Sequence, residues 1–398
     1  MTDSDVNWES GKITDEGVAE MQAVVGKQHI KLEGWNTTVC ADGIRQFALG
    51  VGDDNPLWTD PEYAASSPYG EIIAPPCYLY SHMTGPRLNP ERSGRTAIEE
   101  FLPGVLGLMG NERWVWHRPT FIGETISAET GLDSVTVHES GKFGGRSVTQ
   151  IDRTLFVSAD GDLLAENFTT IRRFERAQTR SKQLYADRPL AHYSQADRDK
   201  FARQYEVEPT QRRGPSPRYV EDVSVGDSLG PILKGPFTIS MAIAFLSGVG
   251  CAFTLGSRLH HTQLKAYPAA LIVHPETGVA ENMGAPHWDT TLARAGGMPT
   301  GYDFGIQRIS WFTHLLTDWA GDHAIIAEVE MRLLKPMFLG DVGWFTGKIA
   351  GIQGNEVTIT IEAKNQMDEV FSVATAKVIL PKKGRLTAHL WHRKNARR

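Results

Sequence analysis

Gly52-Asp53-Asp54-Asn55-Pro56-Leu57-Trp58-Thr59-Asp60 is the stretch that decides the fold, because a related stretch returns about 230 residues later. The later stretch reads Asn282-Met283-Gly284-Ala285-Pro286-His287-Trp288-Asp289. When the two are aligned, each copy keeps part of one set of acid, base and amide side chains and has lost another part. The chain is therefore expected to contain a duplicated module whose two copies have diverged unequally.

Other segments repeat in the same order, which supports the duplication. KPMFLGD at residues 335–341 matches RPTFIGE at 118–124. A helix expected to end at Gly248-Val249-Gly250 matches one expected to end at Gly50-Val51-Gly52. The second copy also carries an insertion, at roughly 251–281, between its helix and its motif loop.

Each copy is expected to form one module. After Thr38, which suits a helix N-cap, apolar residues recur at helical spacing up to Val51. A second apolar helix is expected to open at Ala74-Pro75-Pro76, since proline is tolerated in a first turn. Residues 113–174 then alternate apolar and polar side chains, which predicts an antiparallel sheet. Because the apolar face of a sheet must be covered, we expect one long helix wrapped by a curved sheet in each module.

The expected fold is α+β, with two tandem modules that pair side by side as an internal pseudo-dimer. The expected divisions are an extension at 1–34, the first module at 35–174, a polar connector at 175–217, the second module at 218–381 and a basic tail at 382–398. Within the connector, an exposed helix is expected from Ser194 to about Tyr205.

The bulk composition argues against several classes of protein. A net charge of −6 disfavours a nucleic-acid-binding protein, which normally shows a basic face. Three widely spaced cysteines, Cys40, Cys77 and Cys251, predict neither a disulfide framework nor a metal site. The acidic N-terminus has no apolar leader segment, so a cytoplasmic location is expected. Residues 235–257 carry no charge, but their glycines and hydroxyls favour a buried helix running into a loop over a membrane span.

The first motif resembles that of the MaoC-like family of hot-dog folds, which includes R-specific enoyl-CoA hydratases and 3-hydroxyacyl thioester dehydratases. The family motif is Asp, any residue, Asn-Pro, any residue, His, any residue, Asp, and residues 52–60 fit all but one of these positions. Residues 220–238 also resemble the start of a MaoC-like domain. The resemblance implies a site in which an Asp and a His hold a water molecule. A backbone N–H at the start of the hot-dog helix then receives the thioester carbonyl oxygen.

In the first module, the resemblance assigns Asp53 and Asn55 to the motif but finds Trp58 in the histidine position. Tryptophan cannot take the proton of an attacking water. Where the helix should offer a glycine N–H, this copy has Pro76, which has none. The first module is therefore expected to lack a complete site and to shape an acyl tunnel, with Asn55, Trp58 and Tyr78 as substrate-binding residues.

The second module keeps the histidine, as His287, and a glycine, Gly305, at the start of its helix. Five residues before the histidine stands Asn282, which can hold a water but is not a base near neutral pH. The resemblance implies that His287 is the principal acid and base and that the N–H of Gly305 is the oxyanion donor. The assisting carboxylate is either Asp303, two residues before Gly305, or Asp53 reaching across from the first module.

Several neighbouring residues have a structural interpretation as well as a functional one. Arg308, one turn after Gly305, either contacts a bound thioester or pairs with Asp303. Asp60 and Asp289 are expected to cap the short helices that follow them. The pair His260-His261 has no further ligands at metal spacing, so no metal site is expected.

The expected function is that of a hydro-lyase acting on an acyl-CoA thioester with a long or bulky acyl group, without metal, flavin or nicotinamide. Two alternatives stay open. A thioesterase would use the same fold with a carboxylate driving water onto the carbonyl carbon. A non-catalytic acyl-thioester-binding or partner subunit is favoured by Trp58, Pro76 and Asn282 together. Open sheet edges also favour a homodimer.

Overall fold

The computed structural model describes residues 11–27, 30–86, 88, 101–140, 145–175, 185, 187–251, 254–266 and 271–385. The strands of the first module are β1 (Ile30–Leu32), β2 (Leu106–Trp116), β3 (Ile126–His138), β4 (Ser147–Ser158) and β5 (Leu163–Phe174). Those of the second are β6 (Ser228–Lys234), β9 (Ile325–Leu333), β10 (Gly343–Gln353), β11 (Glu356–Asn365) and β12 (Val370–Ile379).

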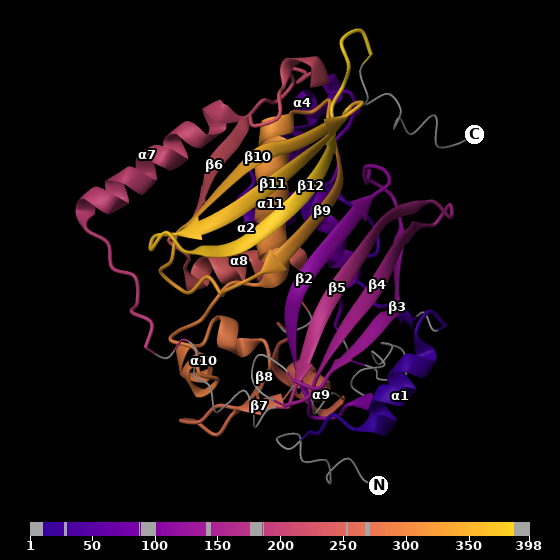
Figure 1. Cartoon of the computed structure of the whole chain (residues 1–398), viewed down its shortest axis with the longest axis vertical. Helices are drawn as coiled ribbons and strands as arrows, with labels where there is room; N and C mark the ends of the chain where they lie inside the picture. The colour runs from indigo at the N-terminus through magenta and orange to yellow at the C-terminus, as the bar shows by residue number, and fades with distance from the viewer. Residues whose placement is uncertain are drawn as a thin grey trace.

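These strands form one antiparallel sheet in the order β1-β3-β4-β5-β2-β9-β12-β11-β10-β6 (Figure 1). Each module keeps its own half of the sheet, and β2 pairs with β9 where the halves meet. Alternate side chains of β11, such as Val357, Ile359 and Ile361, are buried, as expected for a sheet with one covered face. The predicted α+β architecture of two hot-dog modules in a pseudo-dimer is therefore confirmed.

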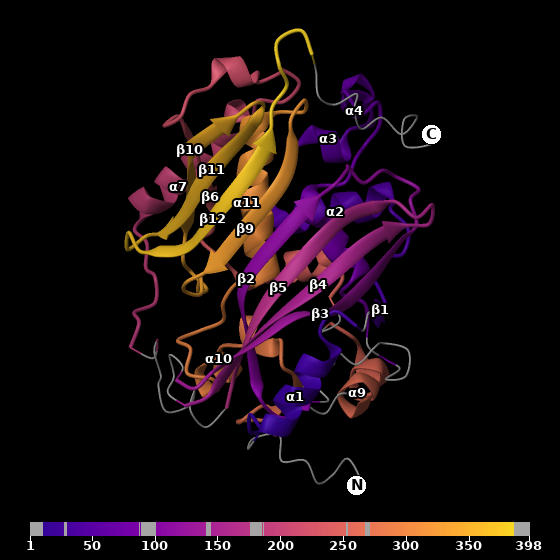
Figure 2. The ribbon, with the colours of Figure 1, turned by 45° about the vertical axis from the view of Figure 1, so that its right-hand side comes forward.

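A pair of equivalent helices joins the two modules on the covered side of the sheet. They are α2 (Ala41–Val51) and α8 (Ile239–Val249), which contact each other and are both labelled in Figure 1. Figure 2 shows α2 behind the strands of the sheet. A side chain on Gly248 would overlap the backbone carbonyl of Gln46, and one on Gly50 would overlap the backbone of α8. Glycine is required at both positions because the two backbones touch.

The start of the first of these helices differs from the prediction. Cys40, not Thr38, is the N-cap of α2, and its Sγ accepts a hydrogen bond from the N–H of Gly43. Thr38 lies in a short bridge to Thr125. The N-cap of α8 is Thr238, so Thr238 corresponds to Cys40.

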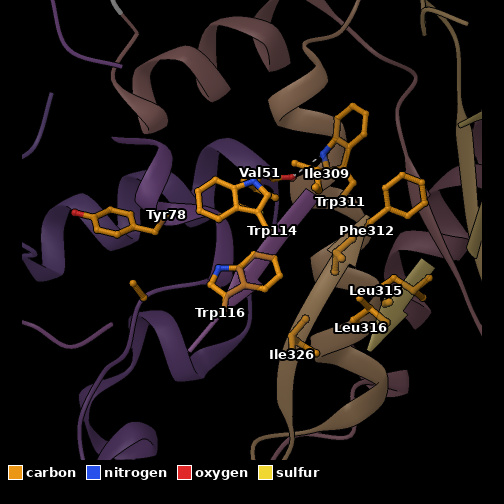
Figure 3. Close-up of a cluster of buried hydrophobic side chains, with 14 of the residues drawn as sticks. Val51, Tyr78, Trp114, Trp116, Ile309, Trp311, Phe312, Leu315, Leu316 and Ile326 are labelled. Carbon is orange, nitrogen blue, oxygen red and sulfur yellow. Dashed lines mark hydrogen bonds between the residues drawn. The ribbon is translucent and has the colours of Figure 1, made fainter. Parts of the chain in front are cut away.

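The core helix of the second module is α11 (Gly305–Ala320), as predicted. Its side chains are buried almost throughout, and they meet Trp114 and Trp116 of the first module (Figure 3). The indole N–H of Trp311 donates to the carbonyl of Val51, at the end of α2 (3.2 Å). The core helix of one module thus packs directly on the other module.

The first module differs from the prediction of one long helix. Its core helix in the described residues is η2 (Pro76–His82), a short 3-10 helix. After it, the chain pairs with an earlier segment, because the N–H of Gly85 donates to the carbonyl of Glu33 (2.9 Å). A side chain on Gly85 would overlap the backbone of Glu33, so the two chain segments can lie this close only because residue 85 is glycine. The first module therefore has a much shorter described core helix than the second.

The first module also begins earlier than residue 35. Strand β1 pairs with β3, and helix α1 (Asp15–Val24) packs on the same strand. Met21 of α1 is fully buried in a small cluster with Leu132 of β3. The predicted N-terminal extension therefore contains the outer strand of the first module, and that boundary is corrected.

The predicted helix of the connector is present and runs further than expected, as α7 (Gln195–Gln211) with Ser194 as its N-cap. It lies along the outer strand β6, where the carboxylate of Glu208 accepts from the N–H of Leu233 (3.1 Å) (Figure 1). One of the two sheet edges that favoured a homodimer is therefore covered.

The insertion of the second module forms α9 (Ser257–Ala266) and a hairpin of β7 (Leu271–Val273) with β8 (Ala280–Asn282). The uncharged segment before it holds α8, which ends at Gly250. In the described part of the chain, no helix is both long and apolar enough to cross a membrane.

All but the first four residues of the predicted basic tail, 386–398, lie outside the described residues.

Candidate active site

The two motif loops have the same backbone structure. In the first, the side chain of Asp53 accepts from the N–H of Asn55 (3.1 Å), and in the second Asn282 accepts from the N–H of Gly284 (2.9 Å). The two hydrogen bonds lie at aligned positions, so the predicted alignment of the two loops is confirmed. Each loop continues into two short helices, namely α3 (Pro56–Thr59) and α4 (Pro61–Ser66) in the first and η5 (Ala285–His287) and α10 (Thr290–Ala295) in the second.

Both predicted helix caps are present in the structure. Asp60 accepts from two N–H groups in the first turn of α4, and Asp289 accepts from the N–H of Leu292 in α10. These bonds explain why aspartate stands at the same place in both loops. The carboxylates are engaged at their helix ends.

The position of the family histidine has a different role in each copy. In the first loop, the indole N–H of Trp58 donates to Oδ2 of Asp53 (3.0 Å), which holds the buried ring in place. In the second loop, Nδ1 of His287 lies 2.9 Å from the carbonyl oxygen of Tyr302. Because a carbonyl only accepts, Nδ1 carries the proton and Nε2 of a neutral ring has a free lone pair.

His287 lies at the beginning of α11. Its ring stacks on Phe304, the residue before the helix, with ring centroids 4.0 Å apart and planes at 23°. The ring of Tyr302 lies on it as well, at 4.3 Å. The side chain is only partly exposed to solvent. Burial lowers the pKa of His287, so the neutral ring, which is the basic form, predominates at neutral pH.

The first turn of α11 has free donors at this place. Its N-cap, Phe304, has no side-chain acceptor for the first N–H groups of the helix. Among the residues that the structure describes, the N–H of Gly305 therefore has no side-chain cap, and it lies at the positive end of the helix dipole. A side chain on Gly305 would overlap Sδ of Met109, a residue of β2 in the first module, so the close packing there also favours glycine.

The structure confirms which residue of the first module corresponds to Gly305. The N–H of Ala74 donates to the carbonyl of Thr120, and that of Asp303 donates to the carbonyl of Met337, each at 2.9 Å. Since Ala74 matches Asp303, Pro76 matches Gly305. The first module therefore has no N–H at the position that corresponds to the predicted oxyanion donor.

Asp303 does not face His287 as a free base. Its carboxylate forms a bidentate pair with Arg308, with 2.7 Å between Nε and Oδ2, and also accepts from the N–H of Met337 (2.9 Å). Arg308 in turn donates to the carbonyls of Lys335 and Phe371. Both members of the pair are buried. Of the two roles considered for Arg308, the structure shows pairing with Asp303.

Asp53 lies too far along α11 to assist His287. Its Oδ1 is 3.8 Å from Nε2 of His314, nine residues after Gly305 on the helix. Nine residues correspond to about 14 Å along the helix axis. Figure 2 shows the corresponding arrangement, with α3 and α4 toward one end of α11 and α10 toward the other. The assignment of Asp53 as a carboxylate of the His287 site is therefore corrected.

Asp53 instead belongs to a buried polar cluster that sequence reasoning missed. Nζ of Lys234 lies 2.7 Å from Nδ1 of His314, and Nε2 of His314 lies 3.2 Å from Oδ2 of Asp318. Arg212 pairs with Asp318 and with Asp54. Burial lowers the pKa of Lys234. The only signal in the sequence was the spacing of His314 and Asp318, one helical turn apart.

The three predicted substrate-binding residues of the first module are not near His287. Asn55 caps α3 by accepting from the N–H of Leu57, and with Trp58 it lines a cavity in the first module. Tyr78 is fully buried against Phe47, at 5.8 Å between ring centroids. Its hydroxyl contacts Asn36. The acyl tunnel expected along these side chains stays a prediction, and the cavity beside Asn55 and Trp58 is compatible with it.

Residues that orient His287 were also missed. Tyr302 and Phe304 lie on either side of Asp303 at the start of α11, whereas the matching residues of the first module are Ile73 and Pro75. An aromatic residue on each side of Asp303, opposite a histidine in the motif loop, was the available signal.

Comparison with known proteins supports the assignment of the fold. Residues 23–167 match the family model of the FAS1-like dehydratase domain region. A UPF0336 protein of Parafrankia sp. (strain EAN1pec) is 28% identical over 123 residues, which are 31% of this chain and 75% of that protein. A UPF0336 protein of Streptomyces avermitilis is 27% identical over 120 residues, 29% of this chain and 72% of that protein.

Two solved structures extend the similarity to most of the chain. A MaoC-like dehydratase superposes with a TM-score of 0.62 at 18% identity, covering 90% of this chain and 99% of the other. A MaoC-like dehydratase from Phytophthora capsici gives a TM-score of 0.53 at 12% identity, covering 92% and 99%. The predicted resemblance is confirmed, and the chain is a two-module hot-dog protein with the fold of the MaoC-like dehydratases.

Proposed function

We propose that the second module catalyses the reversible addition of water to a 2-enoyl thioester of coenzyme A, with His287 as the acid and base. The observation that carries the proposal is the place of this ring. It lies at the uncapped start of α11, and its Nδ1 proton is held by Tyr302. A candidate base thus lies at the same helix start as a candidate oxyanion donor, and hydration of a thioester requires both groups.

In hydration, Nε2 of His287 takes a proton from water while the water oxygen bonds to C3 of the thioester. The electron pair of the double bond moves toward the carbonyl, and the N–H of Gly305 stabilises the negative charge on the carbonyl oxygen. The imidazolium then returns the proton to C2. Dehydration follows the same steps in reverse, so no metal or redox group takes part in the balance.

Asn282 is proposed to orient the water. Its Oδ1 is engaged by the N–H of Gly284, and within the described residues its Nδ2 makes no recorded hydrogen bond. An amide N–H can donate to the water oxygen without taking its proton. The family carboxylate would then be replaced by an amide, so His287 alone moves the proton.

The first module is proposed to contribute to the acyl path through Met109. Its sulfur lies next to Gly305, together with Leu333 of the second module. These apolar side chains are proposed to line the acyl path next to the thioester. Acyl chain length is proposed to depend on how far the flexible Met109 side chain can move.

The thioesterase alternative is less well supported. It needs a carboxylate that drives water onto the carbonyl carbon, and both predicted candidates, Asp53 and Asp303, are held by other groups. A non-catalytic binding subunit remains the second candidate, since an amide stands where the family has a carboxylate.

The test is incubation of the protein with a panel of 2-enoyl-CoA esters of increasing chain length, with two products followed in parallel. Loss of the conjugated double bond without free thiol supports the hydro-lyase. Release of free thiol supports the thioesterase instead. Saturable binding of every ester with neither product would identify a binding subunit and overturn the proposal.

A further inference from the structure

The first module has a cavity of about 80 Å³ beside its motif loop. Asn55 and Trp58 of the loop, Pro76 at the start of η2, and Thr317 and Asp322 around the end of α11 form part of its wall. Most of the remaining lining is apolar, with aromatic rings and branched side chains from both modules, among them Tyr69, Ile73, Trp116, Ile325 and Ile326.

This cavity is separate from the site at His287. Thr317 follows Gly305 by 12 residues on α11, which corresponds to about 18 Å along the helix axis. The loop with α3 and the loop with η5 lie at opposite ends of that helix, and α11 fills the space between them with buried side chains. A ligand in the cavity therefore does not touch the His287 ring.

The cavity is not equipped for thioester chemistry. Pro76 has no N–H to receive a carbonyl oxygen. The two indole N–H groups of its wall are engaged, since Trp58 donates to Asp53 (3.0 Å) and Trp116 donates to the carbonyl of Pro76 (2.8 Å). The cavity is therefore suited to binding rather than to hydration.

Its polar groups indicate which ligands it accepts. Asp322 is 3% exposed, and its Oδ2 accepts from the hydroxyl of Tyr63 (2.6 Å). Within the described residues, Oδ1 has no recorded partner. The guanidinium of Arg118, which also lines the cavity, is paired with Glu124 (2.8 Å) and Asp162 (3.4 Å). Nε of Arg118 is buried without a partner, but the charge of the guanidinium is offset by the two carboxylates. A buried acceptor beside a neutralised cation disfavours anionic ligands and favours a molecule that donates a hydrogen bond.

We propose that this cavity is a second ligand site, for a small, mainly apolar and uncharged molecule that ends in a hydroxyl or amide N–H. The donor end bonds to Oδ1 of Asp322, and the apolar body lies between Trp58 and Trp116. Burial raises the pKa of Asp322, in keeping with its apolar surroundings. The site binds its ligand without reaction.

The experiment is calorimetric titration of the full chain with 4-methylphenol, which has an aromatic body and one hydroxyl donor, and with toluene, which lacks the donor. We expect saturable binding of 4-methylphenol to one site per chain, about ten-fold tighter than toluene. Asp322→Ala should bring the affinity for 4-methylphenol down to that for toluene.

A second variant keeps the test decisive if Asp322→Ala does not fold. Thr317→Leu adds volume to the cavity wall while leaving the bond between Tyr63 and Asp322 in place, and it should abolish binding of both molecules. His287→Ala should leave both affinities unchanged, even though it removes the proposed hydration. The proposal is overturned if wild type shows no saturable binding, if Thr317→Leu binds as wild type does, or if His287→Ala loses binding.

Discussion

The two motif loops differ in chemistry while sharing a backbone. Each begins with an acceptor side chain that bonds the N–H two residues on, and each ends in an aspartate that caps a helix. Yet one copy has Trp58 and Pro76 where the other has His287 and Gly305. The comparison teaches that the shape of the loop depends on backbone and capping bonds. Single replacements at two positions therefore change which groups the loop and the helix start offer, without changing the fold.

The largest expected effect comes from removing the imidazole of His287, which leaves the second module without a base, as the first module already is. His287→Ala should lower the rate of hydration of a 2-enoyl-CoA by at least about 100-fold, because no other group can take the proton of water. His138→Ala, on an exposed strand position of β3, is the matched control and should keep the wild-type rate. Equal rates in the two variants would contradict the assignment of His287 as the base.

The oxyanion donor can be tested by transferring the proline of the first module. In a Met109→Ala background, which makes room for a side chain, Gly305→Pro removes the N–H and Gly305→Ala keeps it. Proline is tolerated at the first helical position, so α11 should persist. We expect kcat of the proline variant to lie about 100-fold below that of the alanine variant. Similar kcat values in the two would show that this N–H does not stabilise the transition state.

The two modules also differ in a buried ion pair. Asp303 and Arg308 of the second module correspond to Ala74 and Leu79 of the first. Arg308→Leu leaves a buried carboxylate uncompensated and should lower the free energy of unfolding by about 3–5 kcal/mol in urea titrations. The double variant Asp303→Ala/Arg308→Leu copies the first module and should recover most of that loss. A double variant as unstable as the single one would contradict the argument.

The sequence predicted the repeat, the hot-dog fold and the location of His287 at the helix start. These follow from local patterns such as helical spacing, alternation and the motif itself. It did not predict where Asp53 would lie, because that depends on which end of α11 each loop meets. Nor did it predict the pairing of Asp303, since two roles for Arg308 fitted the same spacing. The short η2 was missed because Gly85 meets Glu33 only in three dimensions.

The contact between α2 and α8 joins equivalent helices of the two modules. A side chain added to either helix at this contact should therefore destabilise the protein. Gly248→Ala would push a methyl group into the backbone of α2, and we expect a loss of about 1–3 kcal/mol in the free energy of unfolding. Gly351→Ala on β10, where nothing lies within 4 Å, is the control and should be close to neutral. A loss of the same size in the control would mean that the contact is not the cause.

The smallest expected effect is on the pH profile. The base form of His287 is the neutral ring, and burial holds its pKa below the ordinary 6.5. Activity should therefore be retained as pH falls to that value and decline only below it, as the ring gains a proton. The profile of kcat/KM for hydration measures this directly. A decline that begins above neutral pH would contradict the assignment of a desolvated base.

The most direct test of the central claim is a crystal structure of the His287→Ala variant with a 3-hydroxyacyl-CoA bound. The account predicts that the thioester oxygen lies about 3 Å from the N–H of Gly305 and that the C3 hydroxyl points to the space left by the imidazole. A thioester seated in the cavity beside Trp58 and Pro76, with the start of α11 empty, would contradict it.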